Sequence, residues 1–180
     1  MRKSILLLTI LLATNFLNAQ IIEWQQNYGG EGDDKLSSMI KISDGGFLLG
    51  GESGLSSGLV SGNNGSRDYW IVKIDEAGEV LWEQNYGGSR EDVLNDLIET
   101  SDGGFLLGGY SASNDGDVGG NYGWTEVLPK RDYWVVKIDA LGNMEWEQNY
   151  GGTEQDVLEA VLQTSDGGYL LGGKSESIDE

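Results

Sequence analysis

The chain has 180 residues, of which 30 are acidic and 11 are basic, and its formal net charge at pH 7 is −19. A surface this acidic repels phosphate backbones and anionic membranes, so we expect no nucleic-acid partner. The sequence contains no cysteine and no histidine, which excludes disulfides, thiol nucleophiles, Ser–His–Asp triads and Cys/His zinc sites.

The start of the chain, residues 1–19, is predicted to be a secretory signal peptide. Arg2 and Lys3 form a positive head, residues 5–12 are almost wholly apolar, and the small residue Ala19 marks the expected cleavage site. An uncleaved N-terminal anchor is the alternative, but a membrane span needs about 20 apolar residues. Cleavage removes two of the 11 bases, which leaves 9 against 30 acids, a net charge of −21 and no membrane-inserted segment.

The remainder, residues 20–180, is built from an internal repeat. The segments 82–109 and 146–173 are identical at 19 of 28 positions, and 24–51 is a third copy. Repeats of this size indicate stacked or radial arrays of one supersecondary unit. The predicted units are about 21–66, 67–130 and 131–180.

Four short strands are predicted in each complete unit. The clearest is DYWIVKID at 68–75, because aromatic and β-branched residues favour strands. The Asp-Gly dipeptide within SDGG at 101–104 is typical of a tight hairpin turn. The same unit holds three further predicted strands, at 79–86, 92–100 and 105–110. No segment of the repeat shows a convincing helical pattern, so we predict an all-β protein.

The repeat also predicts how the sheets are arranged. Four antiparallel strands with apolar residues on both faces form a sheet that must be covered on each side, and radial stacking of such sheets defines a β-propeller. We therefore predict an incomplete β-propeller-like array of about two and a half to three four-stranded blades, with Trp70 and Trp82 between blades. A β-solenoid is the alternative, although its coils are usually shorter. Since propellers have about 4–8 blades, we expect missing blades or a longer parent chain.

One loop carries a candidate calcium site. Asn114, Asp115 and Asp117 place oxygen-bearing side chains close together among glycines, as calcium prefers. In the gapless counterpart of the first unit, Ser57 and Leu59 replace the two aspartates, so an ordinary polar loop is the alternative. No other cofactor is predicted.

The same region carries a candidate ligand-contact loop. Tyr110, Tyr122 and Trp124 are aromatic residues that the repeat does not share, and the second unit is lengthened by an insertion at 125–130. Aromatic faces on a loop can stack on sugar rings, so a glycan or a surface protein is the expected partner. An ordinary variable loop is the alternative.

The repeated aspartates are interpreted as structural. A catalytic carboxylate pair needs two unlike environments and would normally occur once, whereas these residues recur in every copy. Ser101 recurs too and has no base partner, so no catalytic residue is predicted. The aspartates that follow the Gly-Gly pair are Asp34, Asp92 and Asp156, and those in the SDGG turns are Asp44, Asp102 and Asp166.

The unit W-x-Q-N-Y-G-G…S-D-G-G-[FY]-L-L-G-G…D-Y-W-V-V-K-I-D resembles the long repeat proteins secreted by Bacteroidota, which are similar to the seven-bladed propeller repeat family. The resemblance implies a propeller that is exported, often by type IX secretion, to the surface or exterior of a Gram-negative cell. We predict a non-catalytic exported protein for binding, adhesion or scaffolding. The alternative is a fragment of a secreted carboxylate-dependent glycoside hydrolase or its accessory module.

Overall fold

The computed structural model describes residues 24–122 and 129–178. These residues form β-strands and no helix, so no described segment is a helix that could cross a membrane. The prediction of an all-β fold is confirmed. The predicted signal peptide and Trp124 lie outside the described residues. The strands are β1 (Asp34–Lys41), β2 (Phe47–Ser53), β3 (Asp68–Ile74), β4 (Val80–Tyr86), β5 (Asp92–Glu99), β6 (Phe105–Ser111), β7 (Asp132–Ile138), β8 (Met144–Tyr150), β9 (Asp156–Gln163) and β10 (Tyr169–Ser175).

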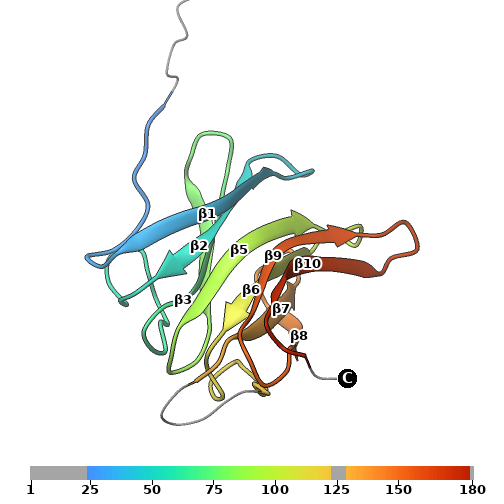
Figure 1. The fold of residues 1–180 in the computed structure, drawn as a ribbon. Coiled ribbons are helices and arrows are strands. Elements are labelled where there is room, and N and C mark those ends of the chain that lie inside the picture. Colours follow the sequence, from blue (N-terminus) through green and yellow to red (C-terminus); the bar gives the residue numbers. More distant parts are fainter. Residues whose placement is uncertain (1–23, 123–128, 179–180) are drawn as a thin grey trace, which may run out of the picture.

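The strands form three antiparallel sheets (Figure 1). Sheet 1 has the order β1-β2-β3-β4, sheet 2 has the order β5-β6-β7-β8, and sheet 3 contains β9 and β10. Four-stranded antiparallel sheets are therefore confirmed. The sheet boundaries differ from the predicted units, because the unit at 67–130 would begin with β3, whereas sheet 2 begins with β5. The chain leaves sheet 1 after Tyr86 and enters sheet 2 at Asp92, whose carboxylate accepts a hydrogen bond from Gly88 N–H at 2.7 Å within the connection.

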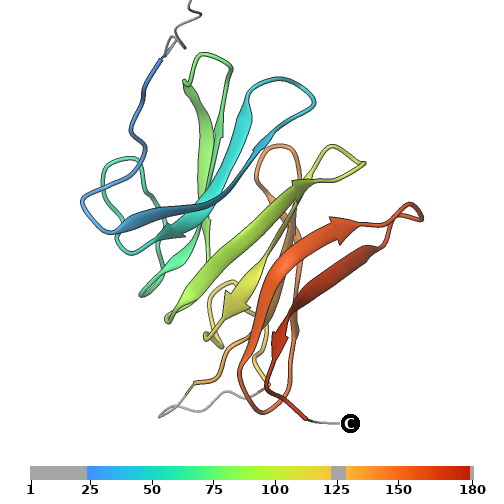
Figure 2. The same cartoon turned by 45° about the horizontal axis from the view of Figure 1, so that its top comes forward.

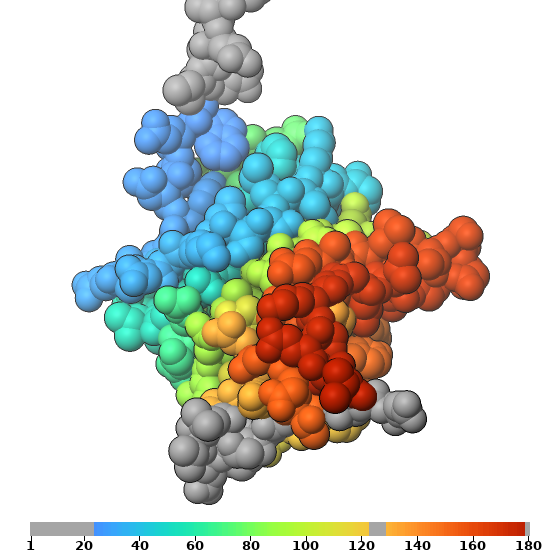
Figure 3. Space-filling view, viewed as in Figure 1, coloured from blue at the N-terminus to red at the C-terminus, as the bar shows by residue number. Residues whose placement is uncertain are grey.

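The three sheets pack face to face in series, with sheet 2 in the middle (Figure 2). Strand β5 packs against β1, β2 and β3, and β9 packs against β5, β6 and β7. In the space-filling view, β1 in blue and β9 in orange lie on either side of β5 in green (Figure 3). Across the two described segments the series is open, so sheets 1 and 3 each keep one face that no other sheet covers.

Aromatic side chains fill the core between sheets 1 and 2. Trp134 on β7 is fully buried, and its ring centroid lies 4.6 Å from that of Tyr69 on β3. This tryptophan lies between two sheets, as the repeat predicts. Its copy Trp70 belongs to a separate cluster on the outer face of sheet 1, where the described residues supply no neighbouring sheet. Trp82 is half-buried and packs against the edge of the central core.

Glycines in the second strands of sheets 1 and 2 allow the next sheet to approach closely. A Cβ atom added to Gly50 on β2 would overlap the side chains of Leu94 and Leu97 on β5. A Cβ atom added to Gly108 on β6 would lie 2.5 Å from Val161 of β9. The apolar side chains of one sheet therefore occupy the space above the glycines of the preceding sheet.

The hairpin turns follow the sequence pattern. In the turn between β3 and β4, the Asp75 carboxylate accepts hydrogen bonds from Ala77 N–H at 2.8 Å and Glu79 N–H at 2.9 Å. Gly78 in that turn has a φ of 84°, which a residue with a side chain rarely adopts. This aspartate therefore caps its own turn.

Candidate ligand pocket

The three calcium candidates lie in the loop between β6 and β7, and they hold that loop in place. Asp115 accepts a hydrogen bond from Ser89 N–H at 2.7 Å, and Asp117 accepts one from Gly87 N–H at 3.1 Å. Asn114 instead accepts a backbone hydrogen bond within its own loop. Throughout the described ranges no group of three or more Asp or Glu side chains is arranged as metal ligands. Calcium binding stays a prediction, and these contacts give the side chains a structural role.

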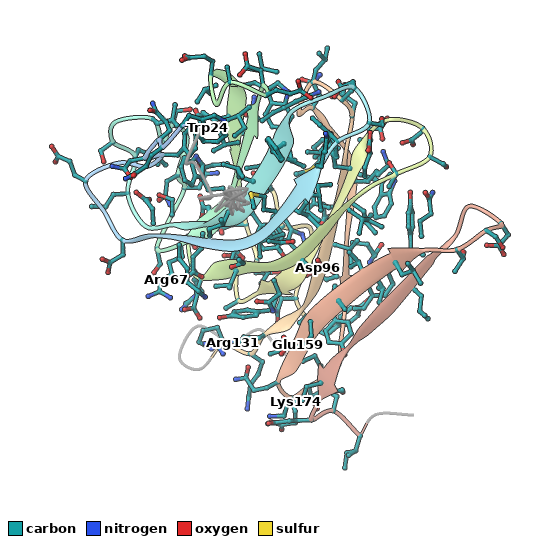
Figure 4. All side chains as sticks on the ribbon, turned by 90° about the horizontal axis from the view of Figure 1, so that it is seen from above. Trp24, Arg67, Asp96, Arg131, Glu159 and Lys174 are labelled. Carbon is teal, nitrogen blue, oxygen red and sulfur yellow. The ribbon has the colours of Figure 1, made fainter. Side chains whose placement is uncertain are left out.

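Tyr110 belongs to an ion-pair cluster at the edges of sheets 1 and 2. Its hydroxyl donates to Glu91 at 3.3 Å, and the Arg131 guanidinium lies 4.5 Å from the centre of its ring. The Glu91 carboxylate also pairs with Arg131 at 2.7 Å and with Arg67 at 3.5 Å (Figure 4). The ring of Tyr110 is therefore covered by a cation, whereas Tyr122 is 67% exposed in the β6–β7 loop.

Tyr122 lines a polar pocket of about 370 Å³ between the β6–β7 loop and the end of β8, which we call the Asn149 pocket. Two glycines of the loop form one wall. The other lining residues are Asn114, Asn121, Tyr122, Glu147, Gln148 and Asn149. Of the predicted site residues, the pocket thus brings together Asn114 and Tyr122, and it adds three polar residues from β8.

The loop that lines the Asn149 pocket differs from the equivalent loop of sheet 1 at position 61/119. In sheet 1 the Ser61 hydroxyl donates to Glu83, and the Ser61 carbonyl accepts a hydrogen bond from the Asn85 side chain. The residue at the matching position of the next unit is Gly119, where an added Cβ atom would overlap the Glu147 carboxylate. The copies of Glu83 and Asn85 in sheet 2, Glu147 and Asn149, line the Asn149 pocket.

Asn149 is the most informative residue of the pocket. Only 3% of it is exposed, and neither its side-chain nitrogen nor its oxygen has a hydrogen-bond partner in the described part of the chain. The side-chain oxygen of Asn121 is also buried without such a partner. An unpaired buried polar group costs about 1–3 kcal/mol, which a ligand with hydroxyl groups would offset.

The electrostatics of the pocket favour a neutral or cationic ligand. Glu147 is the charged residue of the lining, and its carboxylate accepts a hydrogen bond from the Trp134 indole at 2.9 Å, which fixes its position. A fixed carboxylate, several amides and an exposed tyrosine are groups that bind sugar hydroxyls and stack on sugar rings. Sequence reasoning missed the β8 residues because they belong to the repeated W-E-Q-N-Y motif. The available signal was the Ser61 to Gly119 difference between units.

The repeated aspartates after the Gly-Gly pairs have the structural role predicted for them. The carboxylates of Asp34, Asp92 and Asp156 each accept a hydrogen bond from the N–H group four residues earlier, at 2.7, 2.7 and 3.0 Å. Asp92 lies beside Asp68, and both are fully buried. A second such pair, Asp132 and Asp156, is buried in the same way in the next unit. Asp156 also lines a small pocket beside Tyr133 and Tyr150, whereas Asp68, Asp92 and Asp132 are fully buried.

No protein-family model matches the chain. The chain is similar to the regulatory protein FlaEY of Caulobacter vibrioides, with 26% identity over 141 residues. The match covers 78% of this chain but 14% of that protein, so the chain spans a small part of this relative's length.

Proposed function

We propose that this protein is an exported, non-catalytic β-propeller repeat protein that binds a neutral glycan in the Asn149 pocket, at the cell surface or outside the cell. The observation that carries the glycan part is the buried amide of Asn149, which has no partner in the described chain and belongs to the lining of a pocket beside an exposed tyrosine. Hydroxyl groups of a sugar both donate and accept hydrogen bonds, as this amide requires.

The propeller part of the proposal is supported by the repeated packing of the sheets. Sheet 2 covers sheet 1 and sheet 3 covers sheet 2 through equivalent strands, β5 and β9. Successive sheets that pack through the same strands are the arrangement from which a propeller is built.

Export is supported by the signal-like pattern of residues 1–19 and by the resemblance to secreted repeat proteins of Bacteroidota. Mass spectrometry of the exported protein tests whether the signal peptide is removed, and we expect Gln20 to be the first residue of the mature chain.

Glycan binding is tested with an array of neutral oligosaccharides, on the unaltered protein and two pocket variants. We expect binding to weaken at least tenfold in Asn149→Ala, because the buried amide is lost. We expect the same in Gly119→Ser, because a side chain there would overlap the Glu147 carboxylate and displace it from its position in the pocket lining. A tenfold change corresponds to about 1.4 kcal/mol, close to the value of one hydrogen bond.

The matched control is Asn85→Ala, which removes the same residue type from the same place in sheet 1. It should bind as the unaltered protein does. Equal binding by Asn149→Ala and the unaltered protein, or an array without any bound neutral oligosaccharide, would contradict the glycan proposal. Chromatography of the bound sugars separates the alternative function, because a glycoside hydrolase would release shorter products.

A further inference from the structure

Each covered sheet face receives one tyrosine from the preceding sheet. Tyr69 extends from β3 of sheet 1 onto sheet 2, where its hydroxyl donates to the Trp134 carbonyl at 2.9 Å. A Cβ atom added to Gly109 would lie 2.8 Å from the same hydroxyl, so the glycine leaves room for it. We call the arrangement of Gly109, Trp134 and Leu94 around this tyrosine a tyrosine socket.

The interface between sheets 2 and 3 repeats the socket. Tyr133 extends from β7 of sheet 2 onto sheet 3, and a Cβ atom added to Gly173 on β10 would lie 2.8 Å from its hydroxyl. Leu158 of β9 is fully buried beside it, as Leu94 of β5 is in the first socket. Two equivalent glycines therefore receive the hydroxyl groups of two equivalent tyrosines.

The outer face of sheet 1 carries the same socket without a tyrosine. Gly51 is the equivalent glycine, and in the described part of the chain no tyrosine hydroxyl lies as close to it as one does at the other two positions. A cavity of about 200 Å³ lies there instead, lined by Tyr28, Leu36, Leu49 and Trp70 among others. Leu36 is 57% exposed, whereas its copies Leu94 and Leu158 are fully buried.

The segment at 24–28 contacts the β3–β4 turn of sheet 1 in the same way that β4 contacts the β7–β8 turn of sheet 2. The Tyr28 hydroxyl donates to the Gly78 carbonyl at 2.7 Å, just as the Tyr86 hydroxyl on β4 donates to the Gly142 carbonyl at 2.5 Å. The Trp24 ring would be 3.1 Å from a Cβ atom on Gly78 (Figure 4 labels this tryptophan).

The equivalence between the segment at 24–28 and β4 specifies which kind of strand would fill the cavity. Strand β4 pairs with β3 in such a way that Tyr69 lies opposite Tyr86. A strand that paired with the segment at 24–28 in the same register would place its tyrosine opposite Tyr28, directly over Gly51 and Trp70. A β-branched residue two positions later would face the same way, as Ile71 does in β3.

We propose that the outer face of sheet 1 is a docking site for an extended polypeptide segment of the pattern D-Y-W-[IV]-V-K-I, whose tyrosine enters the empty socket. The segment would add as a strand beside residues 24–28, with main-chain hydrogen bonds and the tyrosine ring both contributing to affinity. This inference uses a different surface from the glycan proposal and does not depend on it.

The probe is a fluorescently labelled peptide with the chain's own sequence at 131–142, RDYWVVKIDALG. Fluorescence anisotropy should show saturable binding to the intact protein. We expect the same peptide with its tyrosine replaced by alanine to bind at least tenfold more weakly, because it leaves the socket empty. Equal binding of the two peptides, or binding of neither, would overturn the proposal, and this comparison requires no altered protein.

Two protein variants locate the binding site. Leu36→Glu places a charge in the lining of the empty socket, and we expect it to reduce peptide binding at least tenfold. Leu162→Glu is the matched control, since Leu162 is 58% exposed but lies on β9 at the opposite end of the series. Binding that survives Leu36→Glu, or that Leu162→Glu reduces equally, would place the peptide elsewhere and reject the docking site. Circular dichroism verifies that both variants are folded.

Discussion

Two buried carboxylates meet where the chain passes from sheet 1 to sheet 2. Burial raises the pKa of Asp92 to about 7 and that of Asp68 to about 6, and the nearby charges of Asp68 and Asp117 respectively add to these two shifts. Hydrogen bonds from Gly88 and Ser113 oppose this shift for Asp92 but do not cancel it. In each carboxylate, one oxygen has no partner in the described residues, so there is room for a proton.

This pair predicts that the protein is less stable at alkaline than at mildly acidic pH. The folded chain holds a proton on Asp92 up to about pH 7, whereas the unfolded chain releases it near the ordinary value of 3.8. Stability therefore falls as the pH rises through the window between these values. One pKa unit corresponds to about 1.4 kcal/mol, so the loss should be on the order of a few kcal/mol.

Thermal unfolding at pH 5 and pH 8 measures this effect. The unaltered protein should unfold at the higher temperature at pH 5. In Asp92→Asn the difference should shrink, because an amide keeps a neutral group at this position at both pH values. A melting temperature that rises from pH 5 to pH 8 would show that the pair does not hold a proton.

At the scale of single elements, the SDGG hairpins combine local turn chemistry with one distant contact. The Asp102 carboxylate accepts hydrogen bonds from the Thr100 hydroxyl and from Gly104 N–H, which close the turn between β5 and β6. It also pairs at 3.1 Å with Lys137, whose side chain on β7 is almost fully buried. The turn bonds, followed by this lysine, lower the pKa of Asp102 to about 2.

The third hairpin of the same sequence provides a natural comparison. Asp166 accepts the equivalent bonds from Thr164 and Gly168 but has no lysine partner in the described chain. We expect Asp102→Ala to lower the free energy of unfolding by about 2 kcal/mol, because a buried lysine loses one of its two carboxylate partners. Asp166→Ala should cost about 1 kcal/mol or less. Urea denaturation measures both, and equal losses would mean that the lysine contributes nothing.

The sequence predicted these elements well, because what makes a hairpin is local. The turn at 101–104, the strand at 68–75 and the aspartate at the start of each turn all lie as expected. The pocket residue Asn149 could not be recognised in the same way. Its importance depends on Gly119, which lies 30 positions earlier and contacts β8 only in the folded chain.

At the scale of the whole molecule, stability depends on how closely the sheets stack. Gly50 and Gly172 occupy the same position of the L-L-G-G motif in β2 and β10. Over Gly50 lie the side chains of Leu94 and Leu97, whereas a Cβ atom on Gly172 would meet nothing closer than a carbonyl oxygen at 4.0 Å. The two glycines therefore have the same local sequence and opposite tertiary surroundings.

This contrast predicts opposite outcomes for one substitution. Gly50→Val should lower the free energy of unfolding by about 1–3 kcal/mol, because the added methyl groups push sheets 1 and 2 apart. Gly172→Val should be neutral or slightly stabilising, because valine favours strands and has open space here. Chemical denaturation of both variants measures this. Similar losses in the two variants would contradict the stacked arrangement.

The sequence by itself determined the strands, the hairpin turns and the repetition of one unit, because alternating apolar residues and turn-forming residues act over a few neighbouring positions. Only the tertiary structure decided where one sheet ends and the next begins, that Asp68 and Asp92 form a buried pair, and that Gly51 and Asn149 face open cavities. Repeated sequence makes the units look alike. Packing distinguishes them, because a residue covered by a neighbouring sheet in one unit lies open in the next.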